Sequence, residues 1–138
     1  EKPRQPRNEE NYILLRGKLC YVMLNAYPYN NGHLMISPYR HVVSFDELSD
    51  DECMEVMRVL RLSLVALRKA LSPDGFNIGA NIGSPAGAGM EHLHLHVVPR
   101  WSGDTNFMPV LAETKVISEH LRATYQKLKK AFDEVGGI

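Results

Sequence analysis

The sequence predicts an α+β domain in which two helices pack on one face of an antiparallel sheet. Two observations indicate this class. Short runs of strand-forming residues lie before and after a long amphipathic helix pattern, and a second helix pattern lies near the C-terminus. The chain has 138 residues, of which 44% are hydrophobic and 23% are charged, as in an ordinary globular domain. We therefore expect an N-terminal arm at residues 1–10 and a single domain at residues 11–138.

Charge and cysteine content exclude several classes of protein. Sixteen basic residues balance sixteen acidic ones, so the chain lacks the excess of positive charge with which proteins bind nucleic acid phosphates. No apolar run is long enough to span a membrane, and the first residues contain no apolar signal segment. Cys20 and Cys53 are too few for a disulfide framework. We expect a cytoplasmic protein with no membrane or nucleic acid partner.

The first part of the chain predicts three strands. Residues 12–15 and 19–24 are rich in strand formers, and Gly17 between them suits a hairpin turn. Residues 25–32 have the Asn, Pro and Gly content of a loop. A third strand is expected at residues 33–37, where Pro38 ends it.

The longest helix pattern begins after Ser49, which forms a capping box with Glu52. Beyond it, apolar residues recur at three- and four-residue steps at Cys53, Val56, Leu60, Leu64, Leu67 and Leu71. The Pro-Asp-Gly sequence at residues 73–75 ends the helix. We expect this helix to cover the sheet and to take no part in chemistry.

Two strands and a helix are expected in the second half. Residues 76–82 and 92–98 alternate in polarity, and a glycine-rich turn at residues 83–89 connects them. A terminal helix is expected from about residue 118 to residue 132. Its apolar face consists of Leu121, Tyr125, Leu128 and Phe132.

The second alternating run carries three histidines at every other position, His92, His94 and His96. Side chains of a strand alternate between faces, so the three rings project from one side while the aliphatic residues between them face the other. Three interpretations compete: incidental polar residues on a solvated face, a metal site, or a nucleophilic imidazole whose neighbours set its tautomer and protonate a leaving group. The glycine-rich turn before the run favours the third, because its backbone amides form a nest for phosphate oxygens. The chain has neither a Walker motif nor a dinucleotide-binding fingerprint.

The run from His92 to Val98 resembles the signature of the histidine triad (HIT) superfamily, in which three histidines alternate with hydrophobic residues. Asn81 and Gly83, followed by Ala86 and Gly87, stand at the offsets that this family uses before its triad. Asn25, the segment 32–38 and His41 match its ribose-side and upstream histidine segments. The resemblance covers about residues 12 to 130.

The resemblance implies a five-stranded antiparallel sheet with two helices, usually dimerised, that transfers or hydrolyses nucleotidyl groups at the α-phosphate. Carried over by position, His94 is the nucleophile, His96 contacts the α-phosphate, His92 orients the triad and His33 joins their network. In the binding site, Asn25 holds ribose hydroxyls and Asn81 a phosphate or bridging oxygen, while Gly87 and Gly89 offer amides to the phosphate.

The segment 98–107 resembles bacterial members related to diadenosine tetraphosphate phosphorylases and hydrolases. Arg100 is expected either to bind the distal phosphates or to form a structural pair with Trp101 at the end of the strand. Many relatives have glutamine and a hydroxyl residue where this chain has Ala88 and Gly89, so their leaving-group preference does not carry over. Bacterial relatives also often carry an upstream Cys-x-x-Cys pair, which can bind structural zinc together with histidines near His41 and His92. This sequence lacks such a pair, so no metal is predicted.

The expected function is cleavage of a dinucleoside polyphosphate, such as diadenosine tetraphosphate, by hydrolysis or phosphorolysis through a nucleotidyl-histidine intermediate. The alternatives are a purine nucleoside phosphoramidase and a nucleotide-binding protein with little turnover. The partners expected are an adenine nucleotide substrate and a second copy of the chain. No cofactor is required, although a divalent cation is compatible with a polyphosphate substrate.

Overall fold

The computed structural model describes residues 12–26, 31–87, 91–104 and 114–136. Their five strands are β1 (Ile13–Arg16), β2 (Cys20–Leu24), β3 (Leu34–Pro38), β4 (Gly75–Gly79) and β5 (Leu95–Arg100). Their two long helices are α2 (Asp50–Leu71) and α3 (Thr114–Val135), and two 3-10 turns are η2 (Phe45–Glu47) and η3 (Ser84–Ala86). The expected arm at residues 1–10 lies outside the described residues, and the single-domain boundary stays a prediction.

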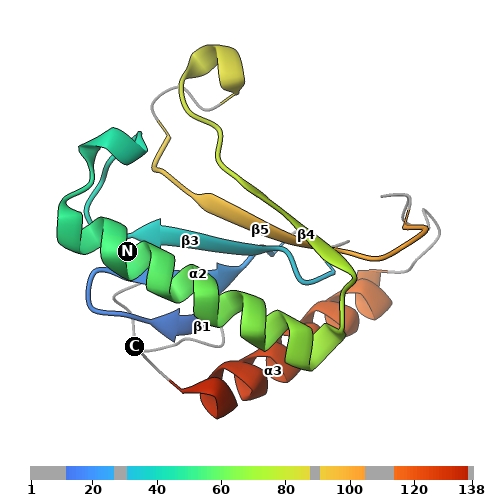
Figure 1. Ribbon diagram of the computed structural model, residues 1–138. Coiled ribbons are helices and arrows are strands. Elements are labelled where there is room, and N and C mark those ends of the chain that lie inside the picture. The colour runs from blue at the N-terminus through green and yellow to red at the C-terminus, as the bar shows by residue number, and fades with distance from the viewer. Residues whose placement is uncertain (1–11, 27–30, 88–90, 105–113, 137–138) are drawn as a thin grey trace.

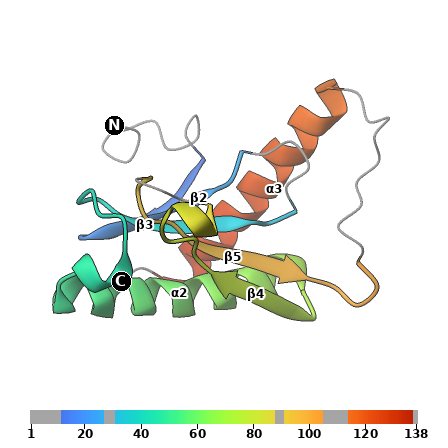
Figure 2. The same ribbon diagram turned by 90° about the horizontal axis from the view of Figure 1, so that it is seen from above.

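The strands form one antiparallel sheet in the order β1-β2-β3-β5-β4. The central pairing joins β3 to β5, with Met35 opposite His96. The predicted α+β class with five antiparallel strands is confirmed. Figure 1 shows both helices on the same face of the sheet, and Figure 2 shows from above that α2 runs along one side of it.

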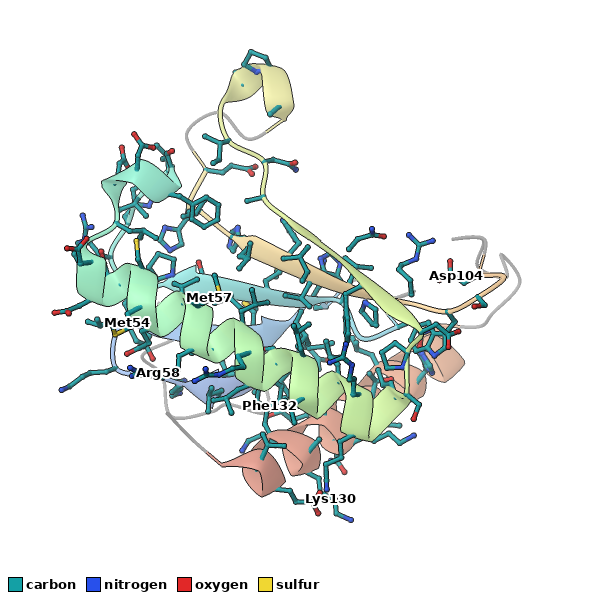
Figure 3. All side chains as sticks on the ribbon, in the orientation of Figure 1. Met54, Met57, Arg58, Asp104, Lys130 and Phe132 are labelled. Atoms are coloured by element: carbon teal, nitrogen blue, oxygen red, sulfur yellow. The ribbon has the colours of Figure 1, made fainter. Side chains whose placement is uncertain are left out.

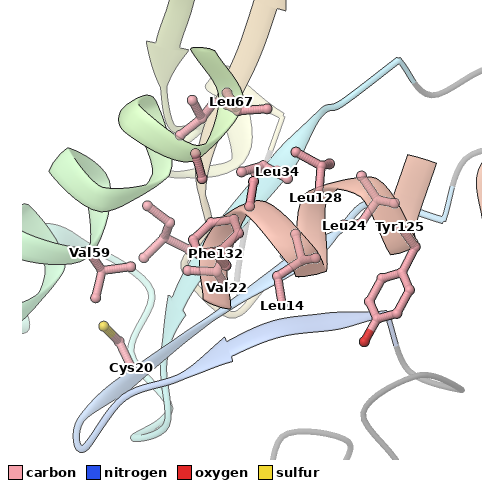
Figure 4. Close-up of a cluster of buried hydrophobic side chains, with 14 of the residues drawn as sticks. Leu14, Cys20, Val22, Leu24, Leu34, Val59, Leu67, Tyr125, Leu128 and Phe132 are labelled. Atoms are coloured by element: carbon pink, nitrogen blue, oxygen red, sulfur yellow. The ribbon is translucent and has the colours of Figure 1, made fainter. Parts of the chain in front are cut away.

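The core lies between the sheet and the two helices. Every second residue of the central strands is buried there, namely Val22, Leu24, Leu34, Ile36 and Val97. These side chains meet the predicted apolar face of α3, which buries Leu121, Tyr125, Leu128 and Phe132. In Figure 3, Phe132 lies between α3 and α2 while Lys130 points away, and Figure 4 shows the cluster closely. Burial of this face stabilises the fold and leaves the opposite face of the sheet open.

The capping box of α2 is confirmed, since the Ser49 hydroxyl accepts from the Glu52 amide and the Glu52 carboxylate accepts from the Ser49 amide. The predicted apolar stripe is partly wrong. The buried face is centred on Val59, Ser63 and Ala66, whereas Cys53 is exposed. The pattern pointed to the wrong centre because α2 carries apolar residues on more than the face that contacts the sheet.

Element boundaries differ from the prediction most in β4, β5 and α3. Strand β4 ends at Gly79 rather than residue 82, and β5 begins at Leu95 rather than residue 92. Both differences have one cause: the ladder between β3 and β5 ends at Ile36 and Leu95, and the ladder between β4 and β5 ends at Gly79 and His96. Helix α3 begins earlier than expected, at Thr114. None of the helices in the described ranges is long and apolar enough to cross a membrane.

Candidate active site

Strands β3 and β5 bring two histidines that are far apart in the sequence into direct contact. His33 precedes β3 by one residue and shares the sheet face of Met35, which pairs with His96. A diagonal neighbour on one face of a sheet is within reach of an aromatic ring. The two imidazoles are joined by a hydrogen bond of 2.9 Å between His33 Nε2 and His96 Nδ1.

Asn25 extends this pair into a chain of three side chains. Its backbone amide donates to the His33 carbonyl, and its Nδ2 lies 3.3 Å from His33 Nδ1. An amide nitrogen only donates, so His33 Nδ1 accepts and His33 Nε2 carries the proton. That proton is donated to His96 Nδ1, so a neutral His96 carries its own proton on Nε2. The hydrogen-bonded series from Asn25 through His33 to His96 therefore leaves an N–H donor at His96 Nε2.

Gly32 allows the chain to enter β3 in this position. Its φ of +97° suits glycine, and a Cβ there would lie 2.6 Å from Leu71 Cδ1 and 3.1 Å from Pro99 Cγ. The backbone just before His33 is thus packed against the end of α2 and against β5. This close packing fixes the position of the backbone from which the His33 side chain projects.

The three histidines of the triad lie in one row of imidazoles. The ring centroids of His92 and His94 are 5.8 Å apart, and those of His94 and His96 are 6.3 Å apart. His41 continues the row by stacking on His92 at 5.1 Å with an interplanar angle of 17°. The predicted grouping of the triad on one side is confirmed, although only His96 lies within β5.

The central rings are neutral at physiological pH. Burial lowers the pKa of His33 to about 4, with a further contribution from His96. Burial is also the main reason that the pKa of His94 lies below its ordinary value, and neighbouring His92 and His96 lower it further. The pKa of His96 is lowered by burial as well. A neutral imidazole has a nitrogen lone pair with which it can attack an electrophile.

His92 is held from outside the triad. Its Nε2 lies 2.7 Å from the Pro38 carbonyl, and because a carbonyl only accepts, Nε2 carries the proton. Its Nδ1 is buried and makes no hydrogen bond to the part of the chain that the structure describes. The Nε2 proton therefore serves to fix the ring rather than to contact a substrate.

The glycine-rich turn stands out from the end of the sheet at η3 (Figure 1). Gly83 and Gly87 have positive φ angles of 84° and 99°, and the Gly87 amide donates to the Ser84 carbonyl. Asn81 is exposed beside this turn. Gly89 lies outside the described residues. Phosphate binding by Asn81, Gly87 and Gly89 stays a prediction.

Arg100 lies at the other end of β5, four residues or roughly 13 Å along the strand from His96. Its guanidinium donates two hydrogen bonds to Asp104, at 2.9 and 2.6 Å, and one to the Asn77 side chain, at 2.9 Å. These contacts give Arg100 a structural role at the end of the strand, with Asp104 and Asn77 rather than Trp101 as its partners, and the phosphate role stays a prediction. Asp104 is labelled at this end of the molecule in Figure 3. The sequence interpretation missed it as a partner, although it follows Arg100 by only four residues.

The described residues contain no group of three or more His, Cys, Asp or Glu side chains arranged to hold a metal ion. His41 and His92, near which the resemblance places the zinc-binding histidines of bacterial relatives, are stacked here. Since His92 Nε2 is bonded to Pro38, that nitrogen is not available to a metal in this arrangement.

Comparison with known proteins identifies the family of this chain. The model of the HIT domain family matches residues 7–103. The chain belongs to the HIT family. It is 46% identical over 125 residues to the AP-4-A phosphorylase of Mycobacterium tuberculosis, an alignment that covers 90% of this chain and 64% of that protein. The HIT chain described here therefore spans less than two thirds of that relative's length.

Two further proteins are similar to the HIT chain, one in sequence and one in structure. The HIT chain is 29% identical over 92 residues to a bis(5'-nucleosyl)-tetraphosphatase of Schizosaccharomyces pombe, which covers 67% of this chain and 50% of that protein. Its structure matches that of a histidine triad nucleotide-binding protein from Sulfolobus tokodaii with a TM-score of 0.72 and 26% identity, covering 90% and 85% of the two chains. The family and the fold expected from the sequence are both confirmed.

Proposed function

We propose that this chain cleaves dinucleoside polyphosphates, such as diadenosine tetraphosphate, at the α-phosphate through a nucleotidyl-histidine intermediate. The observation that carries the proposal is the neutral His94 ring beside the Asn25–His33–His96 chain, which supplies an N–H donor next to a nucleophile. The names of two relatives, a phosphorylase of AP-4-A and a tetraphosphatase, support the substrate class.

In the first proposed step, a ring nitrogen of His94 attacks the α-phosphorus and the P–O bond to the polyphosphate breaks. The His96 Nε2 proton is donated to an oxygen on the phosphate or leaving group, and the hydrogen-bonded chain through His33 sets the tautomer that makes this possible. With diadenosine tetraphosphate, ATP leaves and AMP remains on His94. In this proposal, Asn25 binds the ribose and the turn at residues 83–87 binds the phosphate.

In the second step, a second nucleophile attacks the phosphorus and breaks the P–N bond, which restores the His94 imidazole. The proton that this nucleophile loses returns to His96 Nε2. Water gives AMP, and orthophosphate gives ADP. The 46% identity to a protein named AP-4-A phosphorylase favours orthophosphate as the acceptor. The same relative's name is the basis for proposing that the substrate is an adenine nucleotide.

The test is product analysis with the purified chain, supplied with diadenosine tetraphosphate with and without orthophosphate. We expect ATP and ADP in equal amounts when phosphate is present. ATP and AMP only would make the enzyme a hydrolase. Cleavage of an AMP–amine bond but not of the polyphosphate would identify the phosphoramidase instead. Nucleotide binding without product from any substrate would overturn the enzymatic proposal in favour of a binding protein.

We also propose that a second copy of this chain binds the outer face of α2. That face has a groove of about 760 Å³ lined by residues between Asp50 and Leu64, with Met54 and Met57 more than half exposed (Figure 3). The groove is self-complementary in this proposal: an antiparallel copy of α2 centred midway between Met54 and Met57 would place Asp50 opposite Arg61 in both directions.

The dimer proposal is tested by light scattering on the intact chain. Met57→Glu places a charge in the groove and is expected to give monomers, whereas Val65→Glu alters an exposed apolar residue of α2 that does not line the groove and is expected to leave the dimer intact. A monomeric wild-type chain, or equal effects of the two changes, would contradict the proposal. The cytoplasmic location stays a prediction.

A further inference from the structure

The backbone that carries the candidate nucleophile lies just beyond the end of the β3–β5 ladder. The last paired residues are Ile36 and Leu95, so the peptide that joins Leu93 to His94 is not held by strand pairing. Extending the register would place Pro38 opposite Leu93. Proline has no N–H, so Pro38 cannot donate to the Leu93 carbonyl that would face it.

Two hydrogen bonds hold Leu93 in place of the ladder. Its amide donates to the Val42 carbonyl at 2.8 Å, and its carbonyl accepts from the Ser37 hydroxyl at 2.7 Å. Ser37 has no exposed surface, and the Leu93 side chain is buried as well. The hydroxyl therefore replaces the missing N–H donor in a position that bulk water does not reach.

We propose that Ser37 is a positioning residue for His94. The Leu93 carbonyl is part of the peptide plane that leads directly into His94, so the Ser37 bond fixes the rotation of that plane and with it the direction in which the His94 ring leaves the backbone. The kinetic consequence rests on the proposed function, because it requires His94 to be the nucleophile. The effect on the position of the ring does not.

Removing the hydroxyl has a specific consequence. In Ser37→Ala the Leu93 carbonyl loses the donor that the structure shows, in a buried position where an unsatisfied carbonyl is unfavourable. The plane then rotates to find another donor, and the His94 ring moves with it. A displacement of about 1 Å at a reacting group lowers rates by as much as about a hundredfold, so we expect kcat to fall about ten- to a hundredfold. The KM should stay within about twofold, because Ser37 has no exposed surface with which to contact a ligand.

Ser63→Ala is a matched control. Ser63 is another serine with no exposed surface, and its hydroxyl donates to the Val59 carbonyl at 2.8 Å within α2. Both substitutions thus delete one buried hydroxyl and its bond to a carbonyl, but only one of those carbonyls adjoins the triad. We expect both to lower the melting temperature by similar amounts and only Ser37→Ala to lower kcat.

Nitrogen and proton NMR signals of the histidine rings provide the readout that a merely structural role would not move. The His94 signals and their midpoint of titration should change in Ser37→Ala and stay unchanged in Ser63→Ala. Equal kcat values and equal His94 signals in the two variants would overturn the proposal. If Ser37→Ala does not fold, Ser37→Cys, which keeps a weak donor, is compared in the same way and should show a smaller change of the same kind.

The two proposals fail in different ways. If the wild-type chain yields no product from any dinucleoside polyphosphate, the proposed function is wrong, and the positioning role is then decided by the His94 ring signals alone. If the wild type is active and Ser37→Ala retains full kcat, the proposed function stands and the positioning role is wrong.

Discussion

The two ends of β5 each carry a polar cluster on the open face of the sheet, and the clusters differ in what remains available to a ligand. At the beginning of the strand, His96 accepts from His33 through Nδ1, and its Nε2 makes no hydrogen bond within the part of the chain that the structure describes. At the end of the strand, the guanidinium of Arg100 is bonded to Asp104 and Asn77. The comparison teaches that a residue type suited to phosphate chemistry indicates a ligand site only once the partners of its side chain in the fold are known.

The sharpest test of this comparison is His94→Ala. Loss of a nucleophile commonly lowers turnover by a factor on the order of thousands, and we expect such a loss in kcat with nucleotide binding retained. Steady-state kinetics and calorimetric titration with AMP measure the two quantities. Activity within tenfold of the wild type would show that His94, near the beginning of β5, is not the nucleophile.

A smaller effect is expected from His33→Ala. Without His33 nothing holds the proton of His96 on Nε2, so the donor beside His94 is lost for part of the time. General acid–base catalysis contributes about a hundredfold or more, and we expect kcat to fall by about a hundredfold. Kinetics with a substrate whose leaving group needs no proton serve as the control, since that reaction should be much less affected. Equal losses on both substrates would assign His33 a structural role.

The pH dependence of kcat/KM tests whether the rings are neutral. The pKa of His94 is lowered by burial, so activity should be constant near neutral pH and fall about tenfold per pH unit on the acid side, with a midpoint below about 6.5. Stability must be followed in parallel. The pKa of His33 is about 4 in the folded chain and about 6.5 when unfolded, so the unfolded chain binds more protons between these values and stability is lost as pH falls through this window. An activity midpoint above 6.5 in a folded sample would contradict the assignment.

The smallest effects are expected at the other end of β5. Arg100→Ala and Asp104→Asn remove the same partly exposed ion pair, and each should lower the melting temperature only slightly. Arg100→Ala also removes the bond to Asn77, so we expect it to be slightly more destabilising than Asp104→Asn, with KM for the polyphosphate within about twofold of the wild type in both. A rise in KM in Arg100→Ala that is absent in Asp104→Asn would instead make Arg100 a phosphate ligand.

Much of the fold could be predicted from local patterns. Alternation along residues 93–97 separates His94 and His96 from Leu95 and Val97, and the capping box at Ser49 marks the start of α2. The apolar face of α3 is also as expected. The pattern failed on α2, where apolar side chains occur on several faces and only contact with the sheet decides which are buried.

The sequence by itself determined the periodicity of the strands and helices and the residue types that face each side, because these depend on neighbours a few positions away. The tertiary structure alone decided the contact between His33 and His96, the bond from Ser37 to Leu93 and the bond from Arg100 to Asn77. Each of these depends on where a ladder ends or on how distant strands align. Strand register is set by packing of the whole sheet, and no local pattern contains it.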